Sequence, residues 1–158
     1  MRGRTTEPPR DPWALVLRML NRRDYSVAEL SRRLQQRQVP PDQVASLVVR
    51  CLELSYLDDA RYAEQRARSL MRQGRAVGPR ILIDLKQRGV DEATARDALE
   101  QARQELSDTE VLEELIERRF PQFDYAKADD RERRRVIHFL QRRGFPLNHI
   151  LNKLIEKG

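Results

Sequence analysis

Two segments of the chain place arginines along one side of an expected helix, opposite the apolar residues that would form its core. At 100° per residue, the first of them, the 61–72 stripe, consists of Arg61, Gln65, Arg68 and Arg72. The second, the 131–142 stripe, consists of Arg131, Arg135, His138 and Arg142. Guanidinium groups bind phosphate and carboxylate oxygens in pairs. Each stripe is therefore a candidate contact with a phosphate backbone or with an acidic groove of another protein.

Further arginines extend both stripes. Arg134 widens the 131–142 stripe, and Arg75 and Arg80 continue the 61–72 stripe into the break that follows it. The alternative interpretation of either stripe is a solvated helix face. Like charges four residues apart repel each other, however, so helix stability is a poor reason for the pattern. One expected helix can neutralise a stripe by packing beside it, because it holds Glu110, Glu113, Glu114 and Glu117.

The composition favours an acidic or polyanionic partner. The 158 residues carry a net charge of +6, with 27 arginines against 4 lysines, and a positive charge of this kind attracts anions. GC-rich codon usage explains the ratio of arginine to lysine equally well, but it does not explain the net charge. The excess is spread along the chain, so a basic patch has to arise from the way the residues face.

No set of residues has the pattern of a catalytic or metal site. His138 and His149 are the only histidines, no metal-ligand spacing occurs, and there is no glycine-rich phosphate loop. Two aspartate pairs, 58–59 and 129–130, stand where helices are expected to begin, which favours a role as N-terminal caps. We therefore predict a protein that is not an enzyme and that needs no cofactor and no metal.

The sequence also indicates in which cellular compartment the protein is expected. The single cysteine, Cys51, shares a helical face with apolar residues, and we expect it in the core. No apolar run approaches the roughly twenty residues that are needed to cross a bilayer, and residues 1–12 lack the apolar segment of a signal peptide. We expect a cytoplasmic protein that does not contact a membrane.

One pattern of apolar residues, which we call the hydrophobic phrase, occurs three times about fifty residues apart. It predicts the helices that position the arginines. Its copies begin at Leu30, Ile81 and Val136, and the same offsets of +4, +7, +9, +14 and +18 recur in each. The residue at +7 is always an arginine, namely Arg37, Arg88 or Arg143, and Gln or Gly follows it. Self-similarity of this kind is the mark of repeated structural units. We therefore predict three tandem copies of one unit.

The periodicity predicts an all-α fold of nine helices, three per unit, in an elongated and curved array. We expect a flexible basic arm over residues 1–12, followed by helix-turn-helix-like repeats at 13–57, 58–107 and 108–158. Ser26 and Glu29 have the spacing of a capping box at the start of a helix. Pro41 and Pro79 are placed to begin the third and the fifth helix.

Exposed aromatic side chains, on which nucleic-acid bases could stack, are few. Trp13, Phe139 and Phe145 fall at core or partly buried positions. The candidates that remain are Tyr25, Tyr62 and Tyr125.

The segment between the first and second units has a distinctive sequence. Residues 56–63 read Tyr-Leu-Asp-Asp-Ala-Arg-Tyr-Ala and are followed by Gly74, Gly78, Ile81, Leu85 and Arg88-Gly89-Val90. Upstream, residues 23–30 read Arg-Asp-Tyr-Ser-Val-Ala-Glu-Leu, with Arg33-Leu34 after them. From Trp13 onward the chain resembles the RecX family, bacterial regulators of the RecA recombinase. The third unit matches more loosely, since Phe139 and Leu140 stand where a polar residue and Leu are usual.

The resemblance implies three three-helix repeats that bind RecA filaments on single-stranded DNA and inhibit them. Filament growth, ATP hydrolysis, strand exchange and coprotease activity would fall, which connects the chain to DNA repair, homologous recombination and the SOS response. The expected partners are the RecA filament and single-stranded DNA, with double-stranded DNA as a further candidate, all met through phosphate or acidic groups by a monomer. Within the matching segment, we expect Arg61 to bind and Asp58 to cap.

Two other functions stay open. A helix-turn-helix transcription regulator is the first, although the third helices carry poor sets of residues for reading bases, such as Gln43, Ser46 and Arg50. The second is an adaptor that binds protein only. Sequence-selective retention of DNA would favour the regulator, whereas filament binding without DNA contacts would favour the adaptor.

Overall fold

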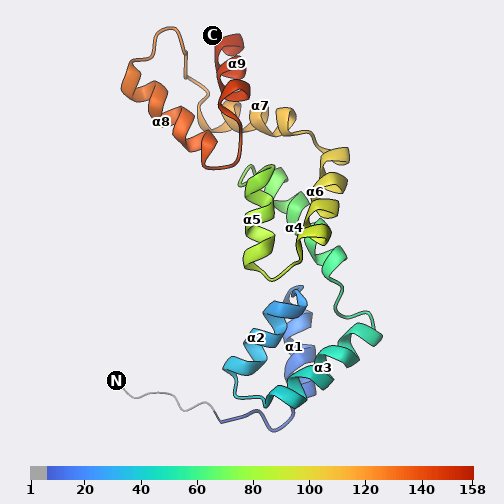
Figure 1. Ribbon diagram of the computed structural model, residues 1–158. Coiled ribbons are helices and arrows are strands. Elements are labelled where there is room, and N and C mark those ends of the chain that lie inside the picture. The colour runs from blue at the N-terminus through green and yellow to red at the C-terminus, as the bar shows by residue number, and fades with distance from the viewer. Residues whose placement is uncertain (1–6) are drawn as a thin grey trace, which may run out of the picture.

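The computed structural model describes residues 7–158, and over this range it consists of helices and the turns that join them (Figure 1). The helices are α1 (Pro12–Arg22), α2 (Val27–Gln36), α3 (Pro41–Glu53), α4 (Asp59–Arg72), α5 (Pro79–Gln87), α6 (Glu92–Glu105), α7 (Asp108–Arg119), α8 (Asp130–Gln141) and α9 (Leu147–Lys157). They form three groups of three that follow one another along a curve. The all-helical, three-repeat prediction is confirmed.

Local sequence explains where the helices begin. Ser26 with Glu29, and Ser107 with Glu110, form capping boxes at the starts of α2 and α7. Single aspartates accept a backbone N–H at the starts of four other helices, at Asp11, Asp58, Asp91 and Asp129. A proline occupies the first turn of α1, α3 and α5. The arm that we expected over residues 1–12 lies partly outside the described residues, and its last residue, Pro12, already belongs to α1.

The apolar residues form two cores. The first repeat has its own core, which includes Val16, Leu30, Leu34 and Cys51, and each of these is fully buried. Repeats two and three share a second core, which runs from Tyr62 on α4 to α9. The first repeat is therefore attached to the second mainly by polar contacts, whereas the second and third repeats are packed together.

One aromatic prediction is wrong. Tyr62 was one of three candidates for base stacking, but only 6% of it is exposed, because it packs in the core of repeat two. Tyr25 and Tyr125 are half-buried, and Tyr56 is the large aromatic residue that is exposed in the described chain. Helical periodicity did not predict that Tyr56 is exposed, since Tyr56 lies in the turn before α4.

The middle helices of the repeats, α2, α5 and α8, follow one another along one edge of the array (Figure 1). The N-terminal end of α2 meets the C-terminal end of α5, because Ala28 packs against Gly89. The N-terminal end of α5 meets the C-terminal end of α8 in the same way, where Val77 packs against Gly144. Each joint therefore uses the residue that follows the arginine of the hydrophobic phrase.

That residue adopts a left-handed backbone conformation in all three copies. The φ angles are 64° at Gln38, 80° at Gly89 and 105° at Gly144. A Cβ at Gly89 would overlap the Cβ of Ala28, and one at Gly144 would overlap the carbonyl oxygen of Val77. Gln38 is exposed, and within residues 7–158 no other repeat packs against it. The two joints therefore require glycine, and the free end accepts a side chain.

We expect Gly89→Ala to lower the free energy of unfolding by about 2–4 kcal/mol, since it adds left-handed strain and forces Ala28 away. Gln38→Ala is the matched control, because glutamine and alanine both carry a Cβ and no other repeat packs against this position in the described chain. It should change the free energy of unfolding by less than about 0.5 kcal/mol. Urea unfolding followed by circular dichroism measures both. Equal effects of the two substitutions would contradict the joint geometry.

Candidate functional site

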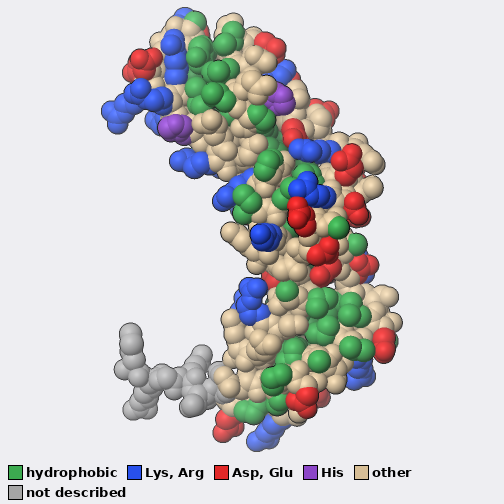
Figure 2. Space-filling model, in the orientation of Figure 1, with side chains coloured by type: hydrophobic (Ala, Val, Ile, Leu, Met, Phe, Trp, Pro, Cys, Tyr) green, Lys and Arg blue, Asp and Glu red, His purple; other side chains and the backbone are tan. Residues whose placement is uncertain are grey.

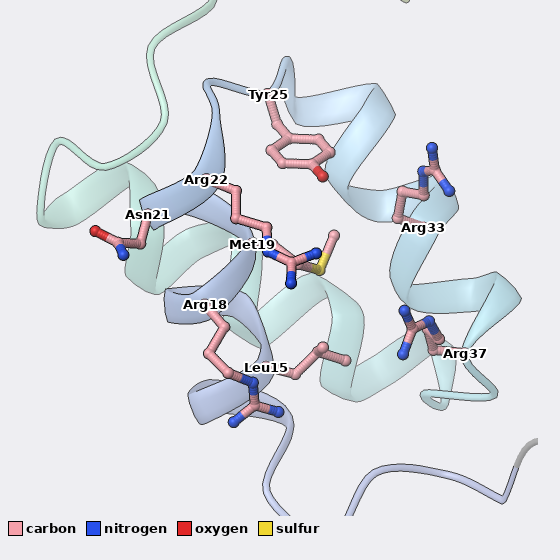
Figure 3. Close-up of a pocket in the computed structure, with 8 residues that line it drawn as sticks. All are labelled: Leu15, Arg18, Met19, Asn21, Arg22, Tyr25, Arg33 and Arg37. Atoms are coloured by element: carbon pink, nitrogen blue, oxygen red, sulfur yellow. The ribbon is translucent and has the colours of Figure 1, made fainter.

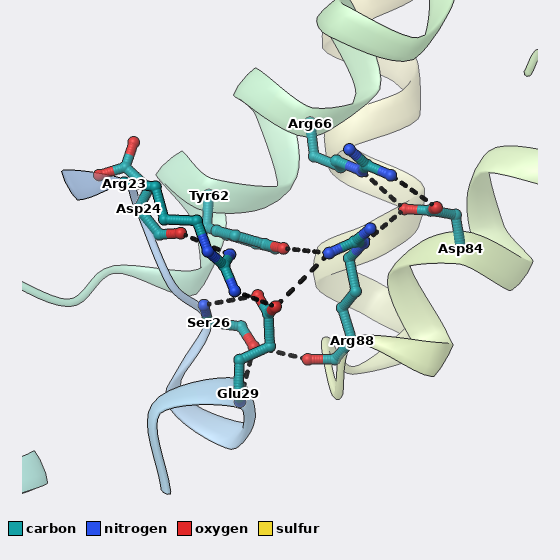
Figure 4. A network of polar contacts seen from close by, with 8 residues as sticks. All are labelled: Arg23, Asp24, Ser26, Glu29, Tyr62, Arg66, Asp84 and Arg88. Atoms are coloured by element: carbon teal, nitrogen blue, oxygen red, sulfur yellow. Dashed lines mark hydrogen bonds and ion pairs between the residues drawn. The ribbon is translucent and has the colours of Figure 1, made fainter. Parts of the chain in front are cut away.

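The first joint, between repeats one and two, is centred on Arg88 at the C-terminal end of α5 (Figure 4). Its Nε lies 3.1 Å from Asp84 Oδ1, and its Nη1 lies 3.4 Å from Glu29 Oε2 on α2. The same Nη1 donates to the hydroxyl of Tyr62 on α4 at 3.4 Å. One arginine therefore ties together three helices from two repeats.

Asp84 is shared between two arginines in this joint. Arg66 on α4 binds both of its oxygens, with Nε–Oδ1 at 2.9 Å and Nη2–Oδ2 at 3.0 Å. Burial by itself disfavours the ionised form, but Arg66 and Arg88 outweigh it and hold the pKa of Asp84 below its usual value. The pKa of Glu29 is also lowered, because its hydrogen bonds and ion pairing outweigh its burial. Both carboxylates are therefore held in the charged form.

Two further hydrogen bonds complete the first joint. Ser26 Oγ, which caps α2, donates to the carbonyl of Arg88, and the N–H of Val27 donates to Asp59 Oδ1 at 2.9 Å. Burial raises the pKa of Asp59, and the bond from Val27 only partly offsets this. Of the two aspartates expected as caps, Asp58 is the cap of α4. Asp59 instead accepts the hydrogen bond from Val27 that connects the second repeat to the first.

The second joint uses Arg143 with backbone acceptors. Its Nε donates to the carbonyl of Gly74 at 3.0 Å, and its own carbonyl accepts from the N–H of Val77 at 2.8 Å. The guanidinium carbon lies 3.6 Å from the centre of the Phe139 ring. Burial, together with nearby arginines, lowers the pKa of Arg143. In the second and third copies of the phrase, the repeated arginine is therefore a joint residue.

The 131–142 stripe lies on the solvent side of α8. Its three arginines, Arg131, Arg135 and Arg142, are exposed, and so is Arg134, which widens it. Within residues 7–158, the ion pair of α8 is the one between Arg133 and Asp130, so these four have no carboxylate within 4.0 Å. Basic side chains project from this region and continue along the concave edge (Figure 2). Arg75 and Arg80 are also exposed, and Arg80 reaches the end of α8 beside Gly144.

The arginines of the 61–72 stripe make contacts with other residues of the protein. Arg68 Nε lies 2.9 Å from one oxygen of Glu105 on α6, and Arg72 Nη2 lies 3.4 Å from the other. Arg61 donates to the carbonyl of Ser55 at 3.2 Å. The structure therefore does not bring the two predicted stripes together as one free surface, because these contacts already occupy the guanidinium groups on α4.

The acidic helix α7 neutralises neither stripe. Glu113 pairs with Lys153 of α9, with Nζ–Oε1 at 2.6 Å, and Glu114 lies 4.0 Å from Arg118 within α7 itself. The acid that does neutralise a stripe, Glu105, lies in α6. Sequence spacing did not reveal this pairing, because it depends on how α4 packs against α6.

A basic pocket in the first repeat was not anticipated. It lies between α1 and α2 and is lined by four arginines, Arg18, Arg22, Arg33 and Arg37 (Figure 3). The signal in the sequence was the spacing of four residues within each pair. That signal is weaker than in the stripes because each pair covers only one turn.

Over residues 7–158, no group of three or more His, Cys, Asp or Glu side chains is placed to hold a metal ion. None of the helices there has the length and apolar character that a membrane span requires.

The fold defines a tandem-repeat protein, built from three jointed three-helix units with exposed arginines. Comparison with known families assigns all three units. Residues 13–51, 58–99 and 107–154 match the models of the first, second and third three-helix domains of RecX. The chain therefore belongs to the RecX family.

Similar proteins agree with this assignment. The regulatory protein RecX of Syntrophotalea carbinolica is 45% identical over 138 residues, which are 87% of this chain and 90% of the relative. That of Trichlorobacter lovleyi is 36% identical over 94% of this chain and 96% of its own length. The crystal structure of RecX from Lactobacillus salivarius has a TM-score of 0.72 at 21% identity and covers 90% of this chain and 93% of that one. At 21% identity, the similarity to this crystal structure supports the fold alone.

The first joint should weaken in acid. Because the folded-state pKa of Asp84 lies below its unfolded value, the stability it contributes is complete above the unfolded pKa of about 4 and is lost as the pH falls through the lower folded value. We expect Asp84→Asn to cost about 1–2 kcal/mol at pH 7 and less at pH 3, which lies below the unfolded pKa. Urea unfolding at the two pH values measures this.

Asp97→Asn is the matched control for this substitution, since Asp97 is exposed on α6. It should leave stability unchanged at both pH values. If Asp84→Asn has the same cost at pH 3 as at pH 7, the ion pairs with Arg66 and Arg88 do not contribute as the geometry indicates.

Proposed function

We propose that this protein is a negative regulator of the RecA recombinase, which binds RecA filaments on single-stranded DNA. By doing so, it suppresses filament growth, ATP hydrolysis, strand exchange and coprotease activity. The observation that carries the proposal is the match of all three repeats to the three RecX domains. The protein acts by binding rather than by catalysis, as a monomer in the cytoplasm, during DNA repair, recombination and the SOS response.

The shape of the molecule supports this function. Three repeats in a curve present a long surface, and the two joints fix the angles between them (Figure 1). A long, jointed molecule can contact adjacent recombinase subunits and DNA phosphates together. Several weak contacts on one scaffold add up to strong binding.

The 131–142 stripe, with Arg134 and Arg80, is the surface that we propose for the filament. Its guanidinium groups are exposed and have no carboxylate partner in the described chain, so binding does not require the loss of an internal ion pair. Arg75 belongs to the same edge. Arg61, Arg68 and Arg72 are secondary members of the proposed site, because contacts with Ser55 and Glu105 must first be exchanged.

The structure gives less support to a transcription regulator. The guanidinium carbon of Arg50 on α3 lies 3.8 Å from the centre of the Trp13 ring, and Arg96 on α6 pairs with Glu92 at 2.7 Å. Side chains that read bases have to reach the major groove freely. The third helices of repeats one and two therefore offer little for base-specific contact.

The first test is recombinase ATP hydrolysis on single-stranded DNA, titrated with this protein from far below equimolar upward. We expect inhibition, because binding along or at the end of a filament interferes with its growth. Onset far below one molecule per recombinase subunit would indicate a block at filament ends. A folded protein that leaves hydrolysis by a matched recombinase unchanged would overturn the proposal.

A second test concerns the stripe. The triple substitution Arg131→Gln, Arg135→Gln and Arg142→Gln should raise the concentration for half-inhibition by at least about tenfold, if each arginine contributes about 0.5 kcal/mol or more. Melting should not change, because these side chains make no internal ion pair. Equal inhibition by the variant and the wild type would exclude the stripe from the interface.

The matched control for the stripe removes three positive charges elsewhere, with Arg32→Gln, Lys86→Gln and Arg96→Gln. It should inhibit as the wild type does. Substitution of Arg68 and Arg72 is a poorer test, because the loss of their pairs with Glu105 should also lower the melting temperature.

A further inference from the structure

The pocket between α1 and α2 is a second basic surface, separate from both stripes. Its volume is about 510 Å³, and its apolar floor is formed by Leu15 and Met19. Arg18 and Arg22 reach it from α1, and Arg33 reaches it from α2, with Arg37 at the C-terminal cap of α2 (Figure 3). No acidic residue lines it. The pocket therefore concentrates four positive charges over an apolar base.

These four arginines have no counter-charge within the described chain. In the first repeat Arg23 pairs with Glu29, and neither of these two residues lines the pocket. In each pair the two arginines stand four residues apart, along α1 or along α2 and its C-terminal cap, where like charges repel each other. The arrangement thus opposes folding of this repeat, and an anion in the pocket would relieve the repulsion.

Comparison of the three copies of the hydrophobic phrase shows that the first repeat differs from the others in the residue that faces its arginine. The residue four positions before the phrase arginine is Asp84 in repeat two and Phe139 in repeat three, and each of them contacts its arginine. In repeat one it is Arg33, so Arg37 meets a second positive charge instead of a partner. The basic pocket is therefore not a by-product of the repeat architecture.

We propose that this pocket binds the phosphodiester backbone of single-stranded DNA. Four residues along a helix correspond to a rise of about 6 Å, so each helix presents two guanidinium groups in a row. Two such rows, facing each other, suit a chain of successive phosphates better than they suit one carboxylate. The inference deepens the proposed function and rests on it for the choice of single-stranded DNA.

The rest of the lining fits a nucleotide as well. Tyr25 stands at the margin of the pocket and is half-buried, with the guanidinium of Arg23 3.8 Å from the centre of its ring. Leu15 and Met19 offer apolar surface to a base or a sugar. Aromatic and apolar contacts beside a basic groove are typical of proteins that hold single strands without reading their sequence.

The test is fluorescence anisotropy of a fluorescein-labelled 15-residue oligo-dT with the full-length protein. The double variant Arg33→Gln, Arg37→Gln should bind about tenfold or more weakly at moderate salt. The slope of log K against log salt should become shallower by about 1.4, since two phosphate contacts are lost. Arg18→Gln, Arg22→Gln on the facing helix should act in the same way.

The matched control, Arg32→Gln, Lys86→Gln, loses the same charge outside the pocket and should keep wild-type affinity and slope. Circular dichroism and melting should show that the pocket variants stay folded, because the substitutions remove like-charge repulsion. If both pocket variants bind oligo-dT as the control does, the proposal is overturned.

Loss of binding to a labelled poly-glutamate peptide, with binding to oligo-dT retained, would also overturn it and assign the pocket to an acidic protein. The wild-type ATP-hydrolysis titration tests the recombinase function separately. Inhibition without pocket-dependent DNA binding overturns the pocket alone. Pocket-dependent DNA binding without inhibition overturns the recombinase function alone.

Discussion

The middle helix of each repeat ends in an arginine followed by a residue of positive φ, and the geometry of the array depends on this ending. The left-handed turn brings the C-terminal end of α5 or α8 close to the helix start of the preceding repeat. The arginine then binds groups of both repeats, through side chains at Arg88 and through backbone carbonyls at Arg143. A single short motif thus ends a helix and sets the position of its neighbour.

The two joints differ in strength for a physical reason. Repeats two and three share one apolar core, so the contacts of Arg143 only align surfaces that are already buried together. The first repeat has a separate core and relies on half-buried ion pairs and hydrogen bonds around Arg88 and Asp59. Such pairs depend on geometry and charge state. The first joint is therefore the one on which pH and substitution act most directly.

Much of the fold could be predicted from the sequence, because periodicity and helix caps are local. The threefold phrase indicated nine helices, and Ser26 with Glu29 marked the start of one of them. The role of Asp59 could not be predicted, since its partner, Val27, lies 32 residues away. The same limit applies to Arg68 and Arg72, which look like free cations until α6 places Glu105 beside them. Sequence predicts which residues face outward, whereas packing decides which of those remain unpaired.

Gln38 has a consequence for the length of the array. At the two internal joints this position is glycine, and the preceding repeat closes over it. At Gln38 a Cβ stands where such a neighbour would have to pack, in the same left-handed conformation. A fourth unit, or another copy of the chain stacked head to tail, would collide there. Stacking of a further repeat through the same joint is therefore blocked at the Gln38 end.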